Sequence, residues 1–120
     1  MASRTENVRV RSIVGRFLEH SRIFHFAAGH ADPAQGEFFI GSADWMFRNQ
    51  RVEVVTLVLA VDAKARLWEV LDACLRDRRQ AWVLGESGAY TQLRPEGSES
   101  GVEARGTHAW LMDLARRRAE

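Results

Sequence analysis

The sequence predicts an α+β domain, in which a mixed β-sheet of four or five strands is flanked by two or three helices. Three observations predict it: short β-branched and aromatic segments separated by turn residues, one long segment with helical periodicity, and a last amphipathic segment after a polar stretch. With 120 residues, 46% of them apolar, the chain is large enough for one domain with a core. We expect a single domain over residues 1–120, comprising an α/β segment (6–94), a linker (95–106) and a C-terminal helix (107–119).

The first segment combines two patterns. Val8 and Val10 alternate with polar residues, which predicts a short strand or an extended lead-in over residues 7–11. The apolar residues that follow recur at helical spacing: Ile13, Val14, Phe17 and Leu18. We therefore expect Ser12 to cap a two-turn helix that ends near Glu19.

The next two segments are typical of strands. Residues 22–27 and 37–40 are rich in aromatic and β-branched side chains, and the small residues of 28–36 separate them. This pattern predicts a hairpin with a long loop. Residues 51–61 become an almost unbroken apolar run, which predicts a central strand buried on both faces.

The second half opens with the strongest helical pattern in the chain. We expect Asp62 to cap a helix that runs to about Trp82, with its inward face formed by Leu67, Val70, Leu71, Cys74 and Leu75. Residues 82–84 and 89–93 predict a second hairpin. Thr107 is expected to open the last helix, with His108 facing solvent in its first turn.

Composition narrows the function classes. The net charge is +1, so bulk electrostatics do not indicate a nucleic-acid partner or an anionic membrane surface. Of 17 basic residues only Lys64 is lysine, and arginine suits phosphate, although codon usage in a GC-rich genome explains most of this bias. The single cysteine, Cys74, excludes an internal disulfide and indicates a reducing compartment. Without an apolar run of membrane-spanning length or a signal sequence, we expect a cytoplasmic protein, with peripheral membrane association left open.

Residues suited to phosphate chemistry gather in two segments. His20-Ser21-Arg22 places an imidazole and a guanidinium two residues apart at the entry of a strand. Gly41-Ser42-Ala43-Asp44 ends the next strand with a small, hydroxyl-bearing turn, from which backbone N–H groups can face an anion. An imidazole, a fixed positive charge and such a turn together favour a phosphoryl-handling site.

These segments resemble the His-x-Lys and Gly-Ser-x-Asn signature of the phospholipase D superfamily, with Arg22 in place of lysine and Asp44 in place of asparagine. A closer resemblance is to bacterial polyphosphate kinase. Its last domain carries Ile-Val-x-Arg-Phe-Leu-Glu-His, found here over residues 13–20, and Ser-Ala-Asp-Trp-Met-x-Arg-Asn, found over 42–49. A strand that opens Arg-x-Glu-Val follows from Arg51. The resemblance covers roughly residues 6–118 and implies a phospholipase-D-like fold.

The resemblance also implies a function. It identifies the chain with the C-terminal part of an enzyme that reversibly moves the terminal phosphate of ATP onto polyphosphate with the help of Mg²⁺. His20 matches the second of two active-site histidines, which contacts the nucleotide phosphates and is proposed to assist proton transfer. Arg22, Ser42 and Arg48 are the further candidates for binding ATP or phosphate, with no metal ligand expected. The nucleophilic histidine and metal-contacting residues belong to parts outside these 120 residues, so the chain alone is expected to be inactive and to hold neither ATP nor Mg²⁺.

Departures from the family pattern leave alternatives open. The turn at Asn49-Gln50-Arg51 is about two residues shorter than in the family. One alternative is a phosphodiesterase or nuclease of the phospholipase D superfamily that completes its site by dimerisation; the other is a non-catalytic assembly module. The expected partners are the remaining kinase domains, ATP or ADP and polyphosphate, within a homo-oligomer and without nucleic acid. His25 and His30 lack metal-ligand spacing, and Glu53 is expected to pair with Arg48 or Arg51.

Overall fold

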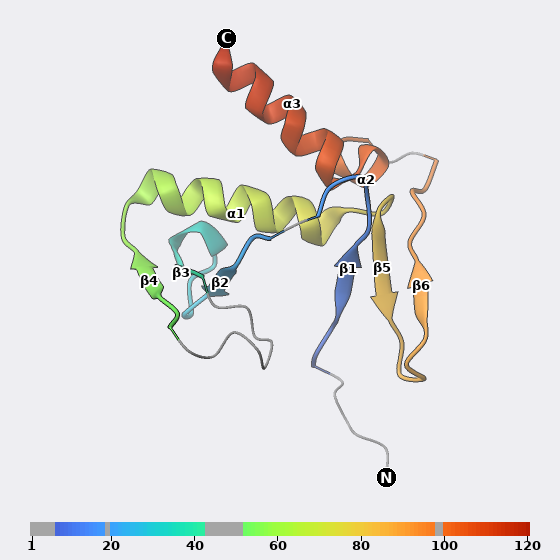
Figure 1. The fold of residues 1–120 in the computed structure, drawn as a ribbon, viewed down its shortest axis with the longest axis horizontal. Coiled ribbons are helices and arrows are strands. Elements are labelled where there is room, and N and C mark those ends of the chain that lie inside the picture. Colours follow the sequence, from blue (N-terminus) through green and yellow to red (C-terminus); the bar gives the residue numbers. More distant parts are fainter. Residues whose placement is uncertain (1–6, 19, 43–51, 98–99) are drawn as a thin grey trace. The chain divides into compact units, whose positions relative to one another are not determined.

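The computed structural model describes residues 7–18, 20–42, 52–97 and 100–120 (Figure 1). It divides into two compact units, Met1–Leu18 with Asp72–Glu120, and Glu19–Leu71. We call them the terminal unit and the central unit, and describe each by itself. The α+β class is confirmed, but the sheet prediction is corrected. The described strands form two three-stranded antiparallel sheets, one in each unit, instead of one mixed sheet.

The sheet of the central unit is built from β2 (Ile23–Phe26), β3 (Glu37–Gly41) and β4 (Val55–Val58), with β3 in the middle. The predicted hairpin is confirmed, since β2 and β3 pair antiparallel. A short 3₁₀ helix (Pro33–Gln35) lies in their connection, where Asp32 accepts a hydrogen bond from the N–H of Ala34 at 3.0 Å. This cap gives the long loop a defined structure.

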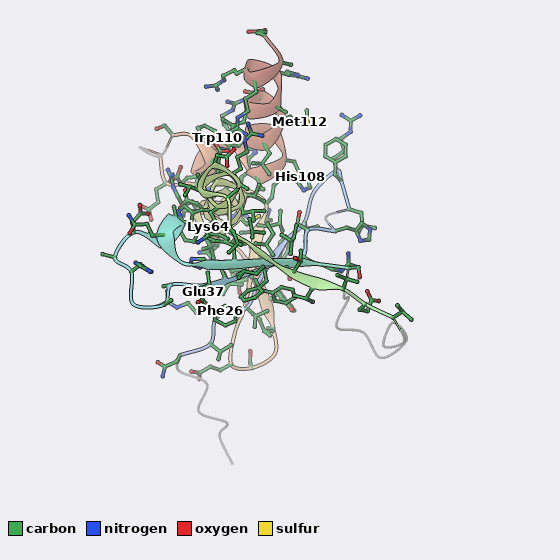
Figure 2. The ribbon with its side chains drawn as sticks, turned by 90° about the vertical axis from the view of Figure 1, so that its left-hand side faces the viewer. Phe26, Glu37, Lys64, His108, Trp110 and Met112 are labelled. Carbon is green, nitrogen blue, oxygen red and sulfur yellow. The ribbon has the colours of Figure 1, made fainter. Side chains whose placement is uncertain are left out.

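One face of this sheet packs against α1 (Val61–Arg76). Phe38 is fully buried, and the His25 ring lies 4.6 Å from the Phe38 ring and 5.0 Å from the Trp68 ring of α1. Lys64 of α1 donates a hydrogen bond to the carbonyl of Gly36 at 3.0 Å. Figure 2 shows Lys64 and Phe26 on opposite sides of the strands. The helix therefore covers one face of the sheet.

The other face has an open apolar surface. Phe26 is 58% exposed, and on β4 the exposed fractions are 51% for Val55 and 46% for Leu57. A shallow, wholly apolar hollow of about 340 Å³ is lined by Phe24, Phe26, Phe39 and Val55. The prediction that β4 is a central strand buried on both faces is therefore wrong for the described residues, in which β4 is an edge strand. The apolar composition of β4 indicates that its side chains favour burial, but it does not show which part of a protein covers them.

The sheet of the terminal unit is formed by β1 (Arg11–Ile13), β5 (Ala81–Leu84) and β6 (Tyr90–Gln92), with β5 in the middle. The hairpin predicted for its last two strands is confirmed. The helix predicted to start at Ser12 is wrong. Ser12 pairs with Trp82 inside the sheet, and the N–H of Val14 donates to the carbonyl of Gln80 at 2.9 Å. Backbone pairing with a distant strand thus replaces the local helical preference of this segment.

α1 ends at Arg76, earlier than predicted, and the next residue explains why. The carboxylate of Asp77 is fully buried and accepts hydrogen bonds at 2.7 Å from the N–H groups of both Arg79 and Gln80. Its second oxygen accepts from the N–H of Thr107 at 2.6 Å and from the Thr107 hydroxyl at 2.7 Å. Asp77 therefore turns the chain out of α1 and also anchors the start of the last helix.

The C-terminal part contains α2 (Val102–Arg105) and α3 (Thr107–Ala119). The start of the last helix at Thr107 is confirmed, whereas the segment expected to be a linker contains the single turn of α2. The prediction that His108 faces solvent is wrong: it is only 8% exposed. Its backbone N–H donates to the side-chain oxygen of Gln80 at 3.1 Å. His108 is therefore buried against the connection between α1 and β5, which contains Gln80.

Candidate functional site

The two predicted phosphate-binding segments lie side by side in the central unit. Ile23 pairs with Ile40, so the start of β2 lies beside the end of β3. The N–H of Gly41 donates to the carbonyl of Arg22 at 3.3 Å. The hairpin thus places the backbone of Arg22 beside Gly41, where the Gly41-Ser42 turn begins. Whether these residues bind phosphate stays a prediction.

His20 lies three residues before the first residue of β2, and it is exposed. It was expected at a helix-to-strand junction, but residues 14–18 are not helical. The guanidinium of Arg22 donates from Nη1 to the backbone carbonyl of His20 at 3.1 Å. This bond ties the arginine to the backbone that carries the imidazole, while the exposed position leaves His20 accessible to a ligand.

Ser42 is held by the sheet more firmly than the sequence indicates. Its N–H donates to the carbonyl of Val54 at 2.9 Å, and its hydroxyl accepts from the N–H of Val54 at 3.1 Å. The hydroxyl also donates to the carboxylate of Glu53. The N–H groups of Gly41 and Ser42 are therefore both used within the sheet. Ala43 and Asp44 lie outside the described residues, so the expectation that N–H groups of this turn face an anion stays a prediction. A serine hydroxyl can donate one hydrogen bond, and here Ser42 donates it to Glu53.

Glu53 lies beside this site, and the sequence did not predict the partner that it has in the structure. The predicted partners, Arg48 and Arg51, lie outside the described residues, as does Asp44 of the turn, so that pairing is untested. The structure shows instead that Glu53 orients the Ser42 hydroxyl. A carboxylate here repels a phosphate unless a cation offsets it. An acidic residue directly before an apolar segment indicated that Glu53 needs a partner. Which partner it finds depends on the register of β3 and β4, which the sequence does not give.

The other histidines of the central unit have different environments. His25 is packed between aromatic rings, and its Nε2 lies 2.8 Å from the carbonyl of Pro33. His30 is exposed in the loop. Across residues 7–18, 20–42, 52–97 and 100–120, no three His, Cys, Asp or Glu side chains form a metal-ligand cluster. Glu53 accepts a hydrogen bond from the Ser42 hydroxyl beside the candidate site, and with no such cluster among these residues the described donor set does not fit Mg²⁺.

The comparisons with known proteins identify the family. The model of the polyphosphate kinase C-terminal domain 2 matches residues 1–104. The chain therefore belongs to the polyphosphate kinase family. Within that family, the part that it represents is this C-terminal domain.

Individual relatives agree. The chain is 50% identical over 97 residues to a polyphosphate kinase of Synechocystis sp., a match that covers 79% of this chain and 13% of the relative. A polyphosphate kinase of Pseudomonas aeruginosa is 40% identical over 111 residues, covering 91% of this chain and 15% of the relative. In the crystal structure of polyphosphate kinase from Porphyromonas gingivalis, the match has a TM-score of 0.78 at 31% identity and covers 96% of this chain and 17% of that one.

The chain is short compared with these relatives. The chain spans about a seventh of the length of these curated relatives. Among the residues that the structure describes, no helix combines the length and apolarity needed to cross a membrane. The matches favour the kinase interpretation over a stand-alone phosphodiesterase of the phospholipase D superfamily, because the named relatives are polyphosphate kinases.

Proposed function

We propose that this chain acts as the C-terminal catalytic part of a polyphosphate kinase, which reversibly transfers the terminal phosphate of ATP to polyphosphate. The observation that carries the proposal is the family match: the family model spans residues 1–104, and the Synechocystis polyphosphate kinase is 50% identical over 97 residues. ATP or ADP and polyphosphate are then its substrates, in a cytoplasmic homo-oligomer.

The open apolar face of the central sheet supports the proposal that the rest of such an enzyme packs against this chain. α1 covers one face of the β2–β3–β4 sheet, but aromatic and aliphatic side chains remain exposed on the other. An apolar surface of this kind gains free energy when it is covered, at roughly 25 cal/mol per Å². Since the relatives are about seven times longer, the occupant that we propose is the remainder of a polyphosphate kinase.

Within the complete site, His20 contacts the transferring phosphoryl group and gives or takes a proton. Arg22 stabilises the developing negative charge on its oxygens, and Arg48 adds a second positive charge. The Ser42 hydroxyl can donate to a phosphate oxygen only when its hydrogen bond to Glu53 is broken, because it has a single proton to donate. Mg²⁺ supplies charge neutralisation to the phosphates in the complete enzyme, and its ligands come from other parts, since the donors described here do not fit it.

The isolated chain is therefore expected to form no polyphosphate from ATP. Alignment and charge stabilisation of phosphoryl transfer need the nucleophile and the metal clamp, and the chain offers no second histidine-bearing motif of this kind. The measurement is ATP-dependent polyphosphate formation by the purified 120-residue chain, at the same ATP and Mg²⁺ concentrations that sustain a full-length kinase control. Steady formation by the chain alone would refute the proposal and favour a self-sufficient enzyme.

A further inference from the structure

The terminal unit contains a basic pocket that shares no residue with the predicted site around His20. It is a hollow of about 230 Å³. Its lining comes from the segment after β1, the turn before β5 and the two C-terminal helices: Arg16, Phe17, Arg79, Gln80, Arg105, His108, Ala109 and Met112. Figure 2 shows His108 and Met112 on the same side of α3, with Trp110 on the other. We call this hollow the arginine pocket.

Its positive charge is only partly compensated. Arg105 pairs with Asp113, and this hydrogen bond is the main reason why the pKa of Asp113 lies below its ordinary value. In the part of the chain that the structure describes, Arg16 and Arg79 have no acidic partner. The guanidinium of Arg16 lies 5.7 Å from the centre of the Phe17 ring, and both arginines are exposed. Two arginines thus remain available to an anion.

His108 forms part of the pocket wall. The His108 side chain is more than nine-tenths buried, beside the Phe17 ring at 5.5 Å. Its Nδ1 lies 3.5 Å from the side-chain nitrogen of Gln80, whereas its Nε2 has no hydrogen-bond partner among the described residues. A buried nitrogen without a partner is costly in a protein that only needs packing there. The ring itself lines the hollow, so its NMR signals report on a ligand bound there.

We propose that the arginine pocket binds phosphate groups of an inorganic polyphosphate chain, as a second contact outside the predicted transfer site. The hollow is large enough for several linked phosphate groups and offers guanidinium groups, which bind phosphate oxygens in pairs. The proposal rests on the proposed function for the identity of the polyanion, but not for the pocket's affinity for phosphate. It adds a holding point for a substrate that is a long repeating polyanion.

The test is titration of the full 120-residue chain with tripolyphosphate at low ionic strength, followed by calorimetry and by the NMR signals of the histidine rings. The expected result is binding that shifts the His108 signal. In the double variant Arg16→Gln/Arg79→Gln, the affinity should fall at least about tenfold and the His108 shift should disappear. The control is Arg66→Gln/Arg117→Gln, which removes the same charge at exposed positions outside this pocket. It should bind within about twofold of the parent.

Two arms separate the sources of phosphate and the two sites. ATP at the same concentration should compete for the pocket more weakly than tripolyphosphate, and Arg22→Gln should leave the His108 shift intact. Equal affinities of the two double variants, a shift confined to His20, or a marked preference for ATP would each overturn the proposal. Thermal melting shows whether both double variants are folded. If the chain binds tripolyphosphate through His108, but a polyphosphate kinase in which it replaces the matching region is folded and makes no polyphosphate, the result would count against the proposed function and not against the pocket.

Discussion

Replacing His20 with alanine is expected to lower turnover by about 10²–10⁴-fold, with much less change in ATP affinity, because acid/base catalysis contributes on that order. The experiment uses a chimera in which this chain replaces the matching region of the Synechocystis polyphosphate kinase, to which it is 50% identical. The exposed position of His20 beside Arg22 means that the change removes little packing. Rate per folded molecule is therefore the readout.

A second substitution separates proton transfer from phosphate contact. His20→Gln keeps a hydrogen-bonding side chain of similar size but does not titrate. If His20 transfers a proton, this variant should lose most of the activity and the pH dependence that His20 imposes. The matched control is His30→Ala, an exposed loop histidine, which should leave turnover unchanged. An active His20→Gln variant with the parent's pH profile would exclude proton transfer and leave His20 as a phosphate contact.

The largest expected loss of stability follows the substitution Asp77→Ala. The Asp77 carboxylate is fully buried and accepts from three backbone N–H groups and one hydroxyl. Its removal leaves these donors without their acceptor, at a cost of about 1–3 kcal/mol for each buried group that water does not reach. We expect the free energy of unfolding to fall by about 3 kcal/mol or more.

Chemical denaturation of the 120-residue chain measures this effect. Asp77→Asn should cause a smaller loss, since one oxygen remains for the Arg79 and Gln80 N–H groups. The control, Glu86→Ala in the exposed β5–β6 turn, should change stability by less than about 0.5 kcal/mol. If Asp77→Ala unfolds at the same denaturant concentration as Glu86→Ala, the carboxylate does not anchor α3 as described.

Local sequence signals predicted the elements whose partners lie nearby. The β2–β3 and β5–β6 hairpins and the start of α3 at Thr107 follow from turn residues and side-chain periodicity. The features that the sequence predicted wrongly depend on contacts between residues far apart in the chain. Ile13 fits a helical pattern, but it pairs with Ala81 in a sheet. The burial of His108 likewise depends on Gln80, which no local pattern links to it.

The candidate site shows the same division. The hairpin pattern was sufficient to bring Arg22 beside the Gly41-Ser42 turn, because antiparallel strands place the start of one beside the end of the next. It did not show that the N–H of Ser42 is hydrogen-bonded to Val54 in the β3–β4 pairing, or that the Ser42 hydroxyl donates to Glu53. The arginine pocket had no signal in the sequence, since its residues come from separate segments.

The most direct test of the account is the rate of ATP-dependent polyphosphate formation by the chimera with the Synechocystis enzyme. The comparison is with the same enzyme lacking its matching region and with the isolated chain. The account predicts that the chimera regains activity within about tenfold of the intact Synechocystis enzyme, while the shortened enzyme and the isolated chain form no polyphosphate. A chimera that melts cooperatively as a folded protein but makes no polyphosphate would contradict it.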